Sequence, residues 1–118
     1  MTTQEIANRL YELGKQGDFG TAQDELFSDD ATSTESNMQG EIETAHGMKA
    51  IKEKGEKFRS MLEEMHGAYT NEPTVFGKYI FMEMGLDATM KNMGRMDMKE
   101  VGLYETKDGK IISERFFY

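Results

Sequence analysis

Four acidic residues in the apolar, alternating C-terminal third of the chain are candidates for exchanging protons with a bound molecule through their carboxylates. They are Glu83, Asp87, Glu100 and Glu114. A carboxylate on an apolar sheet face loses hydration, which raises its pKa and makes it a competent general base near neutral pH. We expect Glu100 to be the base, with Asp87 as the alternative.

Aromatic and polar residues near these carboxylates could complete the site. Tyrosine hydroxyls can donate a hydrogen bond to an enolate-like oxygen, and His66 could donate as well. Aromatic rings and flexible methionines form adaptable apolar walls. The residues expected to line a ligand pocket are Tyr104, Tyr79, Phe58, Met98 and Phe117.

Each candidate also has a structural explanation that needs no ligand. Glu100 would lie diagonal to Arg115 on one hairpin face, which suits an ion pair. Asp87 could face solvent, and His66 at the end of a helix would interact favourably with the helix dipole. Six methionines between Met82 and Met98 could simply fill the core.

Composition excludes several other functions. The chain has 14 basic and 22 acidic residues, a net charge of -8 that argues against binding nucleic acid. With two histidines and no cysteine, we expect neither a metal site nor a cofactor. No run approaches the roughly 18 apolar residues of a membrane helix, and the N-terminus lacks a signal-peptide pattern, so we expect a cytoplasmic protein without membrane contact.

The N-terminal half of the chain is predicted to be mainly helical. Thr2 and Glu5 form a capping-box pattern that starts a helix over residues 3–15, and Asp18 can cap a second, shorter helix. Residues 31–36 are rich in threonine and suit an edge strand, and a short strand is expected around residues 41–43. The longest helix is predicted over residues 48–66.

From Thr74 onward the apolar residues alternate, which predicts strands. Asp108-Gly109 favours a type I′ turn and hence a hairpin with a two-residue loop. That loop predicts four cross-strand pairs: Thr106 with Ile111, Tyr104 with Ser113, Gly102 with Arg115, and Glu100 with Phe117. In this register Glu114 lies on the face opposite Glu100. Helices segregated from antiparallel strands predict an α+β fold with helices on one face of the sheet.

Four short patterns, in this order, point to a known family. They are Gly17-Asp18-Phe19, Leu26-Phe27-Ser28-Asp29-Asp30-Ala31, Gly47-Met48-Lys49-Ala50-Ile51 and Lys107-Asp108-Gly109-Lys110-Ile111. With them the chain resembles SnoaL-like proteins of the nuclear transport factor 2-like superfamily, which also contains ketosteroid isomerases. The resemblance implies one domain over residues 1–118, a cystatin-like α+β roll whose curved sheet forms a cone around a pocket. It also implies a homodimer built on the outer face of the sheet.

The resemblance leaves the activity open, because the superfamily contains isomerases, cyclases, dehydratases, hydrolases and plain binding proteins. One hypothesis is acid–base isomerase or cyclase chemistry on a small apolar carbonyl substrate. The second is a non-catalytic protein that binds a lipophilic ligand. The third is a dimeric accessory domain without a ligand.

Overall fold

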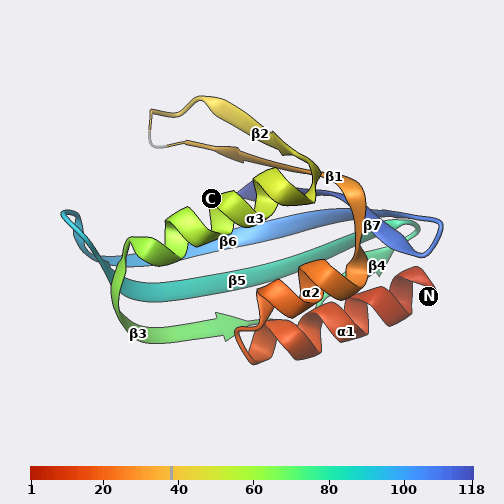
Figure 1. Ribbon diagram of the computed structural model, residues 1–118. Helices are drawn as coiled ribbons and strands as arrows, with labels where there is room; N and C mark the ends of the chain where they lie inside the picture. Colours follow the sequence, from red (N-terminus) through yellow and green to blue (C-terminus); the bar gives the residue numbers. More distant parts are fainter. Residues whose placement is uncertain (38) are drawn as a thin grey trace.

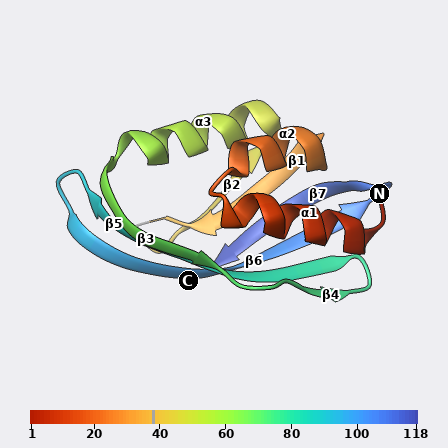
Figure 2. The ribbon, with the colours of Figure 1, turned by 90° about the horizontal axis from the view of Figure 1, so that it is seen from below.

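Three helices lie on one side of a strongly curved sheet (Figures 1 and 2). The computed structural model describes residues 1–37 and 39–118. Its helices are α1 (Thr3–Lys15), α2 (Phe19–Leu26) and α3 (Gly47–Ser60). Its strands are β1 (Phe27–Ser36), β2 (Ile42–His46), β3 (Leu62–Thr70), β4 (Thr74–Phe76), β5 (Tyr79–Met90), β6 (Gly94–Lys107) and β7 (Lys110–Phe117). No helix of the described residues is long and apolar enough to cross a membrane.

The first two helices begin where the sequence predicts. The Thr2 side chain accepts a hydrogen bond from the backbone N–H of Glu5, and the Glu5 carboxylate accepts one from the backbone N–H of Thr2. Asp18 accepts from the backbone N–H of Thr21 and so caps α2. The stripe of Ile6, Leu10 and Leu13 is buried against the sheet.

The sheet order is β2-β1-β7-β6-β5-β3, with β4 paired to β5 beside β3. Every pair is antiparallel except β1 with β7, which run parallel. The predicted α+β architecture is therefore confirmed. The predicted edge position of residues 31–36 is wrong, because β1 lies between β2 and β7. Ser33 of β1 faces the interior of the cone rather than water and is only 1% exposed.

The third helix is shorter than predicted. It ends at Ser60, and residues Leu62–Thr70 form β3, which pairs with β5. Leu62 and Met65 continue the helical spacing of Ile51 and Phe58, so periodicity alone extends the helix too far. The backbone groups of the long β5 offer β3 a full set of partners, and this long-range pairing overrides the local pattern. His66 consequently lies within a strand and not at a helix end.

The C-terminal hairpin has the predicted turn but a different register. Asp108 and Gly109 both have positive φ, 52° and 78°, as a type I′ turn requires. A β-bulge follows, because Glu105 pairs with Ser113 while Thr106 pairs with Ile111, leaving Ile112 as the extra residue.

Beyond the bulge every predicted pair is displaced by one residue. Tyr104 lies opposite Glu114 rather than Ser113, Gly102 opposite Phe116, and Val101 opposite Phe117. A one-residue displacement moves each side chain of β7 to the other face of the sheet. Glu114 therefore joins Glu100 on the concave face, whereas Arg115 and Phe117 lie on the convex face.

The main core lies between the concave face and helices α1 and α2, and Ile51 of α3 extends it. Its larger apolar members are Ile6, Leu10, Leu13, Leu26, Phe27, Ile51, Ile80, Met82, Met84, Tyr104 and Ile111. Helix α3 packs against β1 and β2. The interior between α3 and the sheet is where polar residues gather.

Candidate functional site

Polar side chains from four elements meet on the concave face. This interior cluster consists of Ser33 and Glu35 on β1, Lys54 on α3, Glu100 and Tyr104 on β6, and Glu114 on β7. The strand register brings them together, because Glu114 pairs with both Tyr104 and Ser33. Glu114 is 6% exposed and Tyr104 is 1% exposed, whereas Glu100 is half-buried.

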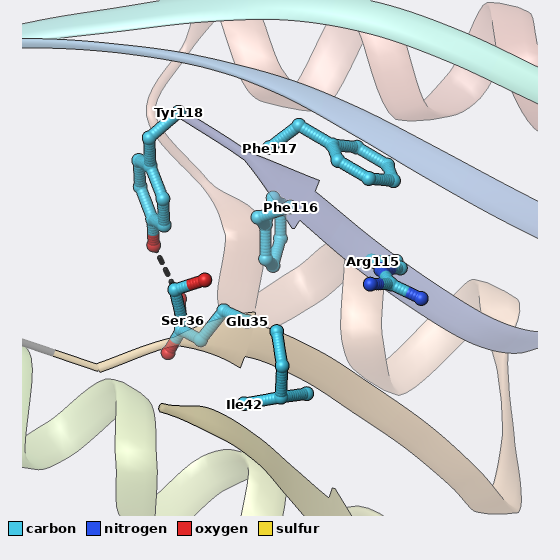
Figure 3. Close-up of a pocket in the computed structure, with 7 residues that line it drawn as sticks. All are labelled: Glu35, Ser36, Ile42, Arg115, Phe116, Phe117 and Tyr118. Atoms are coloured by element: carbon cyan, nitrogen blue, oxygen red, sulfur yellow. Dashed lines mark hydrogen bonds between the residues drawn. The ribbon is translucent and has the colours of Figure 1, made fainter. Parts of the chain in front are cut away.

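A chain of hydrogen bonds links part of this cluster to the surface. The Lys54 ammonium donates to Ser33 Oγ at 2.6 Å and lies 3.2 Å from Glu35 Oε1. The Tyr118 hydroxyl donates to Glu35 Oε2 at 2.5 Å, the dashed contact in Figure 3. The Phe116 ring lies 5.7 Å from the same ammonium. The one cation of the cluster is therefore surrounded by a hydroxyl, a carboxylate and an aromatic face.

Burial changes the protonation of both interior glutamates. Loss of hydration raises the pKa of Glu114 to about 7, against the hydrogen bond from Ser33 and the charge of Lys54. Loss of hydration also raises the pKa of Glu100 to about 7, with a further increase from the Glu35 charge and an opposing effect of Lys54. A carboxylate with a pKa near 7 can take up and return a proton at neutral pH.

Tyr104 is held so that its hydroxyl stays protonated and near the glutamates. Burial raises its pKa well above the usual range, and the charges of Glu114 and Glu100 add to the effect. A Cβ on Gly102 would lie 2.8 Å from Tyr104 Cε2 and 3.0 Å from its hydroxyl oxygen, so only glycine leaves space for this ring. Gly102 lies between Tyr104 and Glu100 on β6, and the hydroxyl therefore extends towards Glu100.

Two aromatic rings pack against the Tyr104 ring. Phe27 meets it edge to face at 6.5 Å and Phe116 at 6.4 Å between ring centroids. Such pairs stabilise a buried ring in one orientation. The arrangement supplies a rigid hydrogen-bond donor beside a titratable carboxylate.

The structure brings only some of the sequence-predicted residues together. Glu100, Tyr104 and Met98 share the concave face of β6. Asp87 and Tyr79 lie on the convex face, away from the interior cluster, because their positions on β5 alternate with buried Ile80, Met82 and Ala88. His66 of β3 lies on the same face, beside Thr89.

The convex residues have partners of their own. Asp87 accepts two hydrogen bonds from the Arg95 guanidinium at 3.0 and 2.9 Å, which lowers the pKa of Asp87. His66 Nε2 lies 2.7 Å from Thr89 Oγ1. These contacts link Asp87 and His66 to neighbouring side chains of the convex face, as the structural explanation expects.

The two predicted phenylalanines also lie apart from the cluster. Phe117 is on the convex face beside Arg115, whose guanidinium carbon is 5.1 Å from the ring centroid. The expected Glu100–Arg115 ion pair is therefore wrong, since the bulge places Arg115 on the other face of β7. Phe58, in the last turn of α3, is 42% exposed.

Sequence reasoning missed three members of the cluster, namely Ser33, Glu35 and Lys54. One signal was present for Lys54, because it follows the buried Ile51 by three residues and so lies on the apolar side of α3. Ser33 and Glu35 had no such signal. Their approach to Glu114 depends on the parallel pairing of β1 with β7, which no local pattern predicts.

Two open hollows adjoin the cluster, and both include Glu35. The first, of about 250 Å³, lies where β1 and β7 end and β2 begins, and Figure 3 shows Phe116 and Phe117 pointing to opposite sides of β7 there. The second, of about 490 Å³, lies between α3 and the β1–β2 pair and includes Lys54. In the part of the chain that the structure describes, no three His, Cys, Asp or Glu side chains are placed to hold a metal ion.

Comparison with known proteins agrees with this fold. A family model of the SnoaL-like domain matches residues 1–118. A crystal structure from Mesorhizobium loti, provisionally described as a SnoaL-like polyketide cyclase and labelled carbohydrate phosphatase, is 39% identical with a TM-score of 0.91, and the match covers 100% of both chains. Among curated proteins, none matches.

Two more distant structures share the fold and were crystallised with small molecules. One is a Catenulispora acidiphila protein with a ketosteroid isomerase-like fold, in complex with trimethylamine. It is 19% identical with a TM-score of 0.73, and the match covers 99% of this chain and 87% of that chain. The other is TerC, co-crystallised with polyporic acid. It is 17% identical with a TM-score of 0.74, and the match covers 98% of this chain and 90% of that chain.

Proposed function

Because the chain belongs to the SnoaL-like domain family, we propose that its interior cluster moves a proton next to the carbonyl of a small apolar substrate, as in an isomerase or cyclase. The observation that carries this proposal is the half-buried Glu100, whose pKa is about 7, on the same face as the rigid Tyr104 hydroxyl. A base and an oxyanion donor on one rigid sheet face are the two groups that enolisation requires.

Each residue has a separate role in this reaction. The Glu100 carboxylate removes a proton from the carbon beside the carbonyl, the C–H electron pair forms the C=C bond of the enolate, and the π pair of the C=O bond moves to the oxygen. The Tyr104 hydroxyl donates a hydrogen bond to the resulting enolate oxygen. Return of the proton to a different carbon completes an isomerisation, whereas attack of the enolate carbon on a second carbonyl closes a ring.

The surroundings of Glu100 suit an apolar substrate. On the concave face it is flanked by Met98 on its own strand and lies opposite Met84 on β5. Flexible methionine side chains adapt to ligands of different shape. TerC, a protein of the same fold, was co-crystallised with polyporic acid, which supports testing cyclic carbonyl compounds first.

Deuterium wash-in tests the proposal without knowledge of the natural substrate. Small cyclic ketones are incubated with the protein in D₂O, and loss of the α-proton signal is followed by NMR. We expect exchange that rises with pH and reaches a plateau above about 7, because Glu100 acts only when it is deprotonated. Heat-unfolded protein provides the background rate. Ketones that raise the melting temperature but exchange only at the background rate would instead favour the non-catalytic binding protein.

We also propose that a second copy of the chain covers the convex face of the sheet. Phe81, Val101 and Phe117 are 41%, 37% and 47% exposed there, and Leu103 lies between them. Neighbouring exposed apolar residues of this kind mark interaction surfaces. The family resemblance implies the same surface for a homodimer.

Val101→Glu is expected to convert the protein from dimer to monomer, because a charge at the centre of the apolar patch loses its hydration in the interface. Sedimentation equilibrium would show the mass falling from twice 13.5 kDa to 13.5 kDa. Ile42→Glu is the control, since Ile42 is also an exposed apolar residue, at 60%, but lies on the edge strand β2. A wild-type protein that sediments as a monomer at high concentration would contradict this proposal.

A further inference from the structure

We propose that the Tyr118 side chain closes a side entrance to the interior cluster, between the ends of β1 and β7, by its hydrogen bond to Glu35. The entrance admits a small apolar molecule when this contact opens. Only the identity of that molecule as a substrate rests on the proton-transfer function proposed above. The entrance itself follows from the way in which the two strands separate.

The side entrance begins where the parallel pairing of β1 and β7 ends. Within the described residues, Thr34 with Arg115 is the last pair between these strands. Beyond it β1 continues along β2, and β7 continues along β6 to the pair of Phe117 with Val101. The hollow of about 250 Å³ lies between the two parted ends (Figure 3). At this point, among these residues, side chains rather than backbone pairing join the two strands.

A side-chain contact spans the gap between the parted ends. The Tyr118 hydroxyl donates to Glu35 Oε2 at 2.5 Å, the dashed line in Figure 3. Tyr118 is 68% exposed, so burial of its ring contributes little to holding it in this position. The ring can therefore swing away once the hydrogen bond breaks, which makes the closure reversible.

Glu35 is the partition between the two hollows, because it lines both of them. Its Oε2 accepts from Tyr118 in the first hollow, whereas its Oε1 lies 3.2 Å from the Lys54 ammonium, which lines the second. Two partners, one in each hollow, fix the carboxylate between them. Without the Tyr118 hydroxyl, the attraction of Lys54 is left to move the carboxylate towards the second hollow and so open the partition.

The interior cluster lies directly behind this partition. Ser33 is the next residue of β1 on the concave face and is 1% exposed. On the other side of the gap, Tyr118 follows the pair of Phe117 with Val101. In this antiparallel register the next residue of β6, Glu100, lies beside Tyr118. A molecule that passes through the side entrance therefore arrives next to the proposed base.

The test uses a cysteine as a reporter, because the chain contains none. Ser33→Cys places one thiol behind the partition, where dithiodipyridine, a small neutral aromatic disulfide, reacts with it only when the side entrance opens. The thiopyridone that is released is followed by its absorbance. Tyr118→Phe, added to this reporter protein, keeps the ring but removes the hydroxyl. We expect it to speed the thiol reaction about tenfold, a factor in keeping with the loss of a hydrogen bond to a charged group.

Tyr69→Phe in the same reporter protein is the matched control. The Tyr69 hydroxyl also donates to a glutamate at 2.5 Å, but its partner is Glu83 on the convex face, and neither residue lines the two hollows. This change should leave the thiol rate unaltered. Melting temperatures establish that each variant is folded, and the rate in urea gives the value for a fully accessible thiol.

Three results would overturn the inference. The first is an equal thiol rate with and without Tyr118→Phe. The second is an equal acceleration by Tyr118→Phe and Tyr69→Phe, which would show that the loss of any such hydroxyl loosens the protein. The third is a reporter thiol that already reacts at the rate measured in urea, because the entrance would then not be closed.

The thiol rates separate this inference from the proposed function. Faster reaction in Tyr118→Phe, together with no ketone exchange by the wild type, would retain the side entrance and reject the enzyme. Ketone exchange by the wild type, with equal thiol rates in the three reporter proteins, would retain the enzyme and reject the side entrance.

Discussion

Glu100→Gln is expected to slow deuterium wash-in by about 10²–10⁴-fold, the contribution typical of a general base. Glutamine has nearly the same shape, but its amide cannot accept the proton from carbon. Because the side chain is only half-buried, the variant should remain folded. The measurement is the α-proton exchange rate by NMR at pH 8, where the wild-type carboxylate is ionised.

Two variants sharpen this result. Glu105→Gln alters a glutamate on the same strand but on the convex face, where its partner is Lys78 at 3.6 Å, and should retain the full rate. Asp87→Asn tests the alternative base and should also retain it, since Asp87 is paired with Arg95 outside the cone. Loss of exchange in Asp87→Asn, with a normal rate in Glu100→Gln, would place the reaction on the convex face and contradict the proposal.

Glu114→Gln is expected to stabilise the protein at pH 8.5 by up to about 3 kcal/mol while changing its stability little at pH 4. The pKa of Glu114 is raised from 4.5 to about 7 on folding, and each pKa unit corresponds to about 1.4 kcal/mol. The folded state therefore favours the protonated acid. Its contribution to stability is fully present below pH 4.5 and is lost as the pH rises through about 7.

The measurement is urea unfolding of the wild type and the variant at pH 4, 6 and 8.5. The wild type should lose stability across this range, and the glutamine variant should lose less because its side chain does not ionise. Glu105→Gln, the same change from carboxylate to amide on the convex face, is again the control. A wild-type–variant difference that is equal at pH 4 and pH 8.5 would show that Glu114 titrates normally in the folded protein.

Taken together, the two predictions imply that the site lowers the stability of the folded protein. A glutamate that is 6% exposed destabilises the folded protein at alkaline pH. An apolar residue of similar volume would remove that cost but also the partner of Ser33. Conflict between stability and a polar interior is typical of functional sites.

Much of the fold follows from local patterns in the sequence. The capping residues Thr2 and Asp18 start the first two helices, and Asp108-Gly109 forms the type I′ turn. Alternation along β6 also places Glu100 and Tyr104 on one face, because residues four apart in a strand share a side. These features depend only on neighbours in the chain, which is why sequence reasoning identifies them.

The composition of the interior cluster was decided by tertiary structure alone. Ile112 is the extra residue of a β-bulge, which moves Glu114 to the face of Glu100. The pattern of hydrophobic residues in the sequence does not reveal such a bulge. Parallel pairing of β1 with β7 brings Ser33 and Glu35 to the same cluster as Glu114, although Ser33 and its partner Glu114 are 81 residues apart in the sequence. The end of α3 at Ser60 likewise depends on the pairing of β3 with β5. In each case the free energy that stabilises the observed arrangement comes from contacts between segments distant in the sequence. The local sequence therefore determines the helices, strands and turns, and the three-dimensional packing determines which side chains meet.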